Sequence, residues 1–238
     1  MTWDTMLKAL IGATLVALST VSPVSAGGPR GHTSLKDEPY PTFSWTGMYV
    51  GMTAGYGWGD SRFDDGARSN PFDIDGFVAG GTLGYNLQMH GNLVVGIEAD
   101  LSYSGISGSF GPGNLGQPGG GGWGCGSGPC ETDVNWFGTV RGRVGLAFDR
   151  MMVFATGGVA FGDVDSQIRN AADFRTGNTA VGWAVGAGME FALRPGWTAK
   201  LEYLHVDLGW TDRTAPNDFR ADAVFDVVRV GLNYQLGR

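Results

Sequence analysis

From Trp45 to the C-terminus, large apolar residues alternate with small or polar residues, which is the pattern of β-strands with one apolar face. Between residues 181 and 191 the odd positions are Val, Trp, Val, Ala, Met and Phe, whereas the even positions are Gly, Ala, Gly, Gly and Glu. This alternation predicts eight strands, near residues 46–58, 74–88, 92–104, 132–148, 151–163, 177–193, 197–208 and 223–236.

Short and long connections between these strands follow each other in strict order. The short ones lie at residues 89–91, 148–150 and 194–196, and the long ones at residues 59–73, 105–131, 164–176 and 209–222. An even number of antiparallel strands, with short periplasmic turns and long extracellular loops, is the plan of a bacterial outer-membrane barrel. We therefore predict an all-β fold, an eight-stranded antiparallel transmembrane up-and-down β-barrel, whose large apolar face points outward. Soluble ligand-binding barrels have the opposite polarity.

The seventh strand fits the alternation least well. Leu204 and Val206 share the parity of Lys200 and Glu202, so one face changes from charged to apolar within the strand. A β-bulge near Tyr203, or the exit of the strand from the membrane at this point, would explain the change.

Aromatic residues gather at the two ends of the predicted outer faces. Such girdles mark the two membrane–water interfaces of outer-membrane barrels. The predicted interface residues are Trp58, Trp136 and Trp183 toward the long loops, and Phe148, Phe191, Trp197 and Tyr234 toward the short turns.

The inward parity carries four acidic and four basic residues. They are Glu98, Asp100, Arg141, Arg143, Glu190, Lys200, Glu202 and Arg229. On neighbouring strands, Glu98 and Asp100 can reach Arg141 and Arg143, and Lys200 and Glu202 can reach Arg229. Eight-stranded barrels have interiors that side chains just fill, and buried charges require partners, which favours a lumen plugged by salt bridges. The alternative is a charged constriction that lines a narrow pore.

The first residues of the chain have the features of a secretory signal. Lys8 precedes the apolar run of residues 9–18, and small residues at 24–26 suit cleavage after Ala26. We assign residues 1–26 to a cleaved signal peptide, residues 27–44 to a flexible periplasmic leader and residues 45–238 to the barrel domain. A transmembrane anchor is the competing interpretation, but the apolar run is shorter than the roughly 20 residues that span a bilayer.

The composition argues against several classes of function. The net charge is −7 and basic residues are not clustered, which argues against a nucleic-acid partner. Cys125 and Cys130 are the two cysteines, and in an exported chain they predict one disulfide across a small loop. Two thiolates without neighbouring histidines make a poor zinc site, and we expect neither a metal nor another cofactor.

The loops and strands offer little catalytic chemistry. Loop 59–73 and its flanks carry Asp60, Asp64, Asp65, Asp73 and Asp75, but without the spacing of a calcium-binding EF-hand. His205 lies in a strand with Asp207 two residues on, and no serine follows them there. A histidine of the interface girdle is the simpler interpretation, so we expect no enzymatic activity. In the glycine-rich loop 105–131, Trp123 is a candidate anchor for contact with a partner molecule at the surface.

Six segments in register resemble a known family. They are SWTGMYVGMTAGYGWG (44–59), NLVVGIEADLSYS (92–104), WFGTVRGRVGLAFDRMMVFATGGVAFG (136–162), VGWAVGAGMEFAL (181–193), WTAKLEYLHVDLG (197–209) and VVRVGLNYQLG (227–237). Together they resemble the small outer-membrane β-barrel proteins of alphaproteobacteria, which include rhizobial and brucella-type major surface proteins and hemin-binding porin-like proteins. That family usually ends its last strand on an aromatic residue, where this chain has Leu236 followed by Gly237 and Arg238.

The resemblance implies an OmpA-like barrel in the outer membrane of a Gram-negative bacterium, surrounded by lipid and lipopolysaccharide and inserted by the barrel-assembly machinery. The leading hypothesis is a non-enzymatic surface protein that contributes to envelope integrity. The alternatives are a narrow porin-like diffusion channel, and binding of hemin or a host partner through the extracellular loops.

Overall fold

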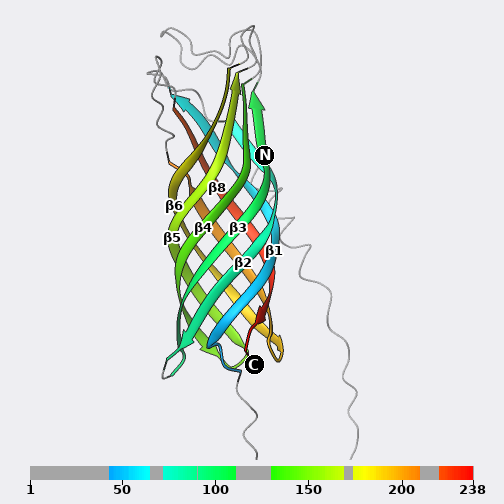
Figure 1. Cartoon of the computed structure of the whole chain (residues 1–238), viewed down its shortest axis with the longest axis vertical. Coiled ribbons are helices and arrows are strands. Elements are labelled where there is room, and N and C mark those ends of the chain that lie inside the picture. The colour runs from blue at the N-terminus through cyan, green and yellow to red at the C-terminus, as the bar shows by residue number, and fades with distance from the viewer. Residues whose placement is uncertain are drawn as a thin grey trace, which may run out of the picture. The chain divides into compact units, whose positions relative to one another are not determined.

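The computed structural model describes residues 43–64, 72–89, 91–110, 130–168, 174–209 and 220–237. Within these residues, eight strands form one closed antiparallel barrel, in which each strand pairs with the next and β8 pairs with β1 (Figure 1). The strands are β1 (Gly47–Asp64), β2 (Phe72–Gln88), β3 (Leu93–Phe110), β4 (Cys130–Phe148), β5 (Met151–Ile168), β6 (Phe174–Arg194), β7 (Trp197–Asp207) and β8 (Arg220–Gln235). The predicted fold is confirmed. No helix in the described residues has the length and apolarity to cross a membrane.

Tight turns join the strands at one end of the barrel, which is the lower end in Figure 1. Asp149–Arg150 connects β4 to β5, and Pro195–Gly196 connects β6 to β7. Asp149 and Gly196 have φ angles of 53° and 79°, the left-handed conformation that short hairpin turns require. We refer to this end as the short-turn end and to the opposite one as the long-loop end.

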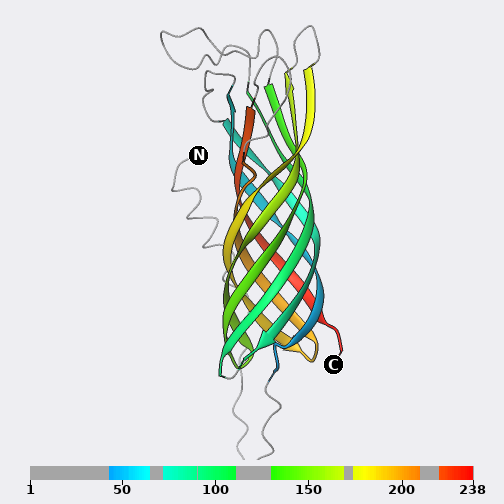
Figure 2. The ribbon, with the colours of Figure 1, turned by 60° about the vertical axis from the view of Figure 1, so that its left-hand side comes forward.

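Toward the long-loop end, every strand except β7 continues beyond its predicted limit. β3 runs to Phe110 instead of residue 104, and β5 runs to Ile168 instead of residue 163 (Figure 2). The prediction stopped where the outer face becomes polar. The ladder continues because inward residues such as Ile106 and Val164 remain apolar and are buried inside the barrel.

Two irregularities of register lie in the same region. β3 and β4 shift between Tyr103 and Ile106, and β4 and β5 shift between Val134 and Trp136. The extra residue in β4 is Asn135, and it changes which parity faces inward. Phe137 and Val134 are therefore both buried in the lumen, although their positions differ by an odd number.

The bulge expected near Tyr203 is absent. β7 pairs without interruption from Ala199 to Asp207 with both β6 and β8. Leu204 and Val206 consequently stay on the inward face with Lys200 and Glu202, and both are completely buried. Of the two explanations offered from the sequence, the bulge is therefore wrong, and the inward face itself changes polarity along its length.

Candidate functional site

The lumen of the barrel holds all eight charged residues that share the inward parity. They come from four acidic and four basic positions on β3, β4, β6, β7 and β8, and each is at most 5% exposed: Glu98, Asp100, Arg141, Arg143, Glu190, Lys200, Glu202 and Arg229. Strand alternation places them there, because every second side chain of a barrel strand points inward. Four negative and four positive charges make this layer formally neutral.

Arg141 on β4 joins three carboxylates. Its Nη2 lies 2.7 Å from Glu98 Oε1 and 2.9 Å from Asp100 Oδ2, both on the neighbouring β3. Its Nη1 lies 2.9 Å from Glu202 Oε1 on β7, across the lumen. The remaining donor, Nε, bonds Thr139 Oγ1 at 2.8 Å. The guanidinium is therefore bonded on both of its edges, which holds it in one orientation.

Arg229 and Lys200 close the network from the other side of the barrel. Arg229 Nε is 2.7 Å from Glu202 Oε2 on the adjacent β7, and its Nη1 is 3.0 Å from Asp100 Oδ1 on β3. Lys200 Nζ on β7 is 2.8 Å from Glu98 Oε2. Two of these three contacts cross the lumen, so the charged layer ties opposite walls of the barrel together.

Arg143 occupies the side of the network nearer the short turns. Its Nη2 is 2.9 Å from Glu190 Oε2, and its Nη1 donates to the hydroxyl of Tyr49 at 2.8 Å. That hydroxyl donates in turn to Glu98 Oε2 at 2.7 Å. The guanidinium carbon also lies 4.1 Å from the centroid of the Phe154 ring, at cation–π distance.

The sequence-based pairing was correct for neighbouring strands and incomplete across the lumen. Arg141 contacts Glu98 and Asp100, and Arg229 contacts Glu202, as adjacency predicts. Lys200, which was grouped with Arg229, instead binds Glu98 on a distant strand. Sequence reasoning also missed the neutral members of the network, although inward parity could have identified them: Tyr49, Thr139, Thr156, Thr198 and Asn233.

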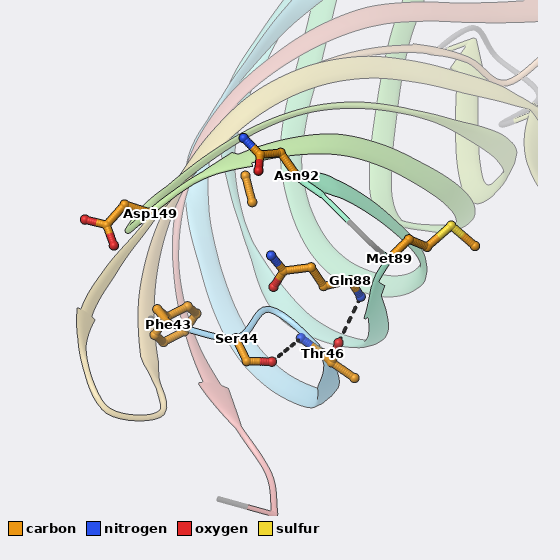
Figure 3. A pocket seen from close by; sticks show the side chains of 8 residues that line it. Phe43, Ser44, Thr46, Gln88, Met89, Asn92 and Asp149 are labelled. Atoms are coloured by element: carbon orange, nitrogen blue, oxygen red, sulfur yellow. Dashed lines mark hydrogen bonds between the residues drawn. The ribbon is translucent and has the colours of Figure 1, made fainter. Parts of the chain in front are cut away.

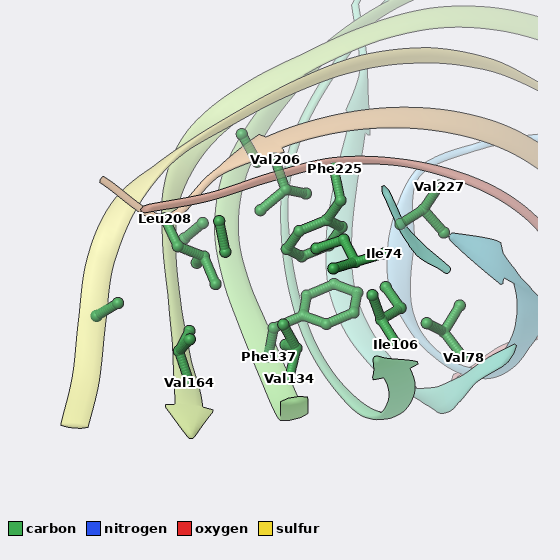
Figure 4. Packing of buried hydrophobic residues seen from close by; sticks show 14 of the residues in the cluster. Ile74, Val78, Ile106, Val134, Phe137, Val164, Val206, Leu208, Phe225 and Val227 are labelled. Atoms are coloured by element: carbon green, nitrogen blue, oxygen red, sulfur yellow. The ribbon is translucent and has the colours of Figure 1, made fainter. Parts of the chain in front are cut away.

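Beyond the charged layer, toward the long-loop end, the lumen is mainly apolar, although the buried side chains of Ser61 and Thr132 also lie there. The rings of Phe137 and Phe225 meet edge to face with centroids 5.3 Å apart. Further buried residues surround them, as Figure 4 shows: Ile74, Val78, Ile106, Val134, Val164, Val206, Leu208 and Val227. Leu204 belongs to the same cluster. We call this cluster the apolar layer. It reverses the polarity of the charged layer on the same inward faces, and the sequence reading did not anticipate it.

The short-turn end is closed by residues 43–46, which we call the N-terminal segment. Trp45 enters the mouth of the barrel and packs with Val94, Ala147, Met152 and Phe154 in a second buried cluster. Beside this segment lies an open pocket of about 450 Å³, seen in Figure 3. Its lining residues are Phe43, Ser44, Thr46, Gln88, Met89, Asn92, Ala147 and Asp149.

The outer face carries the aromatic residues that the girdle pattern selected. Trp183, Phe148, Phe191 and Tyr234 are each 40–50% exposed, and Trp58, Trp136 and Trp197 are partly exposed. Between the two groups the exposed residues are apolar, for example Val140, Val144 and Leu146 on β4. A closed barrel with an apolar outer band between two aromatic groups suits a lipid bilayer.

His205 also lies on the outer face, but its carboxylate partner differs from the one considered from sequence. Its Nδ1 is 2.8 Å from Asp226 Oδ1 on β8, and the same oxygen accepts the hydroxyl of Tyr203 at 2.7 Å. Asp207 instead accepts the backbone N–H of Gly209. The indole of Trp183 lies 5.4 Å from the imidazole, which places His205 among the interface aromatics.

Several predicted features lie outside the described residues. These are the signal peptide, the leader up to residue 42, Asp65, Trp123, Cys125 and the side chain of Cys130, so the disulfide and loop contacts with hemin or a host stay predictions. Asp60, Asp73 and Asp75 belong to strands β1 and β2 rather than to a loop, and Tyr56 donates a hydrogen bond to Asp75. Within the described part of the chain, no group of three His, Cys, Asp or Glu side chains is arranged to hold a metal ion.

The chain is similar to several known outer-membrane proteins. The chain is 37% identical to the 31 kDa outer-membrane immunogenic protein of Brucella melitensis, over 96% of this chain and 100% of that protein. It is 33% identical to the 22 kDa outer membrane protein of Rhizobium leguminosarum bv. viciae, over 70% of this chain and 66% of the relative. The solved structure of the attachment invasion locus protein of Yersinia pestis matches 79% of this chain and 99% of its own, with 13% identity and a TM-score of 0.40.

The family model described as outer membrane protein beta-barrel domain matches residues 35–235, which include every strand of the structure. The relatives are named as outer-membrane proteins, and the apolar outer band shows how this barrel is suited to that location. The chain belongs to the outer-membrane protein β-barrel family and is an outer-membrane protein of a Gram-negative bacterium.

Proposed function

We propose that this protein is a non-enzymatic, non-conducting surface barrel that contributes to the integrity of the outer membrane. The observation that carries the proposal is the filling of the lumen by successive layers. A neutral network of eight charged side chains occupies the middle, the apolar layer follows toward the long loops, and Trp45 fills the opposite mouth. Bonded charges that cross the lumen and close apolar packing support a rigid wall more than a path for solutes.

The outer surface supports the proposed partners. Its apolar band and aromatic ends suit contact with membrane lipid and with lipopolysaccharide, and insertion would use the barrel-assembly machinery. The name of the Brucella relative, an immunogenic outer-membrane protein, supports a surface role for the long loops. Surface interactions would then occur on the loops, while the filled barrel serves as their anchor.

The second candidate function is a narrow diffusion channel, which the charged layer favours because charged side chains commonly line the polar interior of porins. The two candidates differ in one observable, the passage of ions through a single folded barrel. If the apolar layer and the charged layer each block the lumen, then opening one of them leaves the other in place.

We predict that the purified protein gives no steady single-channel conductance in planar lipid bilayers. Arg141→Ala, which opens the charged layer, and the double variant Phe137→Ala with Phe225→Ala, which opens the apolar layer, are each expected to remain silent. Only the combination of these three substitutions with Trp45→Ala is expected to leak, because the charged layer, the apolar layer and Trp45 in the opposite mouth are three blocks in series and all must be removed. Folding of every variant is verified by heat-modifiable migration in gels.

Steady conductance of the unaltered protein that changes with Arg141→Ala would establish the channel function instead. Val140→Ala is the matched control, because this neighbour of Arg141 lies on the outer face of the same strand and is 44% exposed. Its recordings should equal those of the unaltered protein under either hypothesis.

A further inference from the structure

The N-terminal segment is attached to the barrel mouth by side chains of two strands. The backbone N–H of Trp45 donates to Gln88 Oε1 at 3.0 Å, and Gln235 Nε2 donates to the carbonyl oxygen of Thr46 at 2.7 Å. Trp45 is only 2% exposed, so its indole is enclosed by the barrel wall. A hydrogen-bond partner for the indole N–H must therefore lie inside the mouth.

Three buried polar atoms at this mouth have no hydrogen-bond partner among the described residues. They are the indole Nε1 of Trp45, Oδ1 of Asn86 on β2 and Oε1 of Gln235 on β8. All three residues line the same cavity, whose volume is about 10 Å³. Buried polar groups in native proteins are almost always hydrogen-bonded, so three unpaired groups around one cavity indicate a bound ligand.

The hydroxyl groups and the carboxylate that line this cavity already have partners. Thr198 Oγ1 donates to Glu190 Oε1 at 2.5 Å, and the second oxygen of Glu190 pairs with Arg143. The Tyr49 hydroxyl donates to Glu98. The ligand must therefore complement one hydrogen-bond donor, the indole N–H, and two acceptors, the side-chain oxygens of Asn86 and Gln235.

We propose that a single water molecule binds in this cavity. The water accepts a hydrogen bond from the indole N–H of Trp45 and donates hydrogen bonds to Asn86 Oδ1 and Gln235 Oε1. A cavity that holds one probe sphere, roughly 10–15 Å³, has room for one water and for nothing larger. An anion would face two carbonyl oxygens, and a metal ion would face the N–H group of the indole, so neither suits this set of partners.

The position of this water has a consequence for the seal at the short-turn end. The water joins the N-terminal segment to β2 and β8, which flank β1 on its two sides. It adds a further polar connection to the contacts that Gln88 and Gln235 make with the segment. The water therefore helps to hold the Trp45 indole in the mouth.

The test uses the folded barrel in lipid nanodiscs, with ¹⁵N-labelled tryptophan. The chain contains eight tryptophans, and the Trp45 indole signal is assigned by its loss in Trp45→Phe. We expect a cross-peak between this indole proton and water, with the sign of a water that tumbles with the barrel. A solvent-protected Trp45 indole proton without such a cross-peak in the unaltered protein would overturn the proposal.

Two variants make the assignment specific. Asn86→Leu removes one acceptor and fills the cavity with methyl groups, so the water cross-peak should disappear while the Trp45 indole signal persists. Asn92→Ala removes an exposed amide near the same mouth and should leave the cross-peak unchanged. A cross-peak that survives Asn86→Leu would place the water elsewhere and contradict the proposed site. The unaltered protein decides the question even if Asn86→Leu does not fold.

Discussion

Replacing Glu98 with glutamine is expected to lower the free energy of unfolding by about 3–5 kcal/mol, the usual cost of removing one partner from a buried ion pair. Glu98 lies 2.7 Å from Arg141, 2.8 Å from Lys200 and 2.7 Å from the hydroxyl of Tyr49. Glutamine keeps the shape of the side chain but offers one oxygen instead of two, and its NH₂ group faces cationic donors. The lumen is left with one uncompensated positive charge.

The measurement is equilibrium urea unfolding in lipid vesicles, followed by tryptophan fluorescence. Asp149→Asn is the matched control, because it also converts a carboxylate to an amide, but in an exposed turn where asparagine tolerates the left-handed backbone. Adding Lys200→Met to Glu98→Gln restores neutrality and should recover part of the loss. A loss below about 1 kcal/mol for Glu98→Gln, the value of an exposed pair, would show that the network contributes little to stability.

The second large effect is expected for Gly158→Ala, with a loss of about 3 kcal/mol, the upper end of the range for overpacking. Gly158 on β5 pairs directly with Arg141 on β4. A Cβ atom at this position would lie 2.1 Å from the carbonyl oxygen of Val140 and 2.7 Å from Arg141 Cα. Both are backbone atoms, so β4 and β5 would have to separate and Arg141 would move away from its carboxylates.

Gly157→Ala is the internal control for this prediction. Gly157 precedes Gly158 in the chain but faces outward, and its nearest contact for an added Cβ is the carbonyl oxygen of Ala184 at 3.7 Å. The expected change is within about 0.5 kcal/mol. Urea unfolding and heat-modifiable migration of the two variants are compared in parallel. Equal losses for both would mean that inward crowding at Arg141 is not what requires glycine at position 158.

The strands and their faces could be predicted because strand alternation is a local property. A period of two residues places Glu98, Asp100, Arg141 and Arg143 on one face whatever the rest of the chain does. Because the alternation is local, it also explains why the inward parity of β4 was not predicted correctly along its whole length. One extra residue at Asn135 changes the parity of β4, and no pattern in the sequence marks that position.

The apolar layer escaped prediction for a related reason. An inward face was expected to be polar along its whole length, because the outer face was apolar. Beyond the aromatic residues at the long-loop end, the outer face becomes polar and the inner face becomes apolar. The outer face meets water there, and the inner side chains pack against one another. Leu204 and Val206 are the residues where this reversal was visible in the sequence, which offered a bulge or exit of the strand from the membrane as its explanation.

The sequence by itself determined the number of strands, their order, the outward apolar band and the identity of the eight inward charges. These depend on local periodicity and on the neutrality that buried charges require. Only the tertiary structure decided that Arg229 reaches Asp100, that Lys200 binds Glu98 and that Trp45 enters the mouth. Closure of β8 onto β1 brings distant strands to face each other across a narrow lumen, and their meeting points depend on the stagger of the whole barrel.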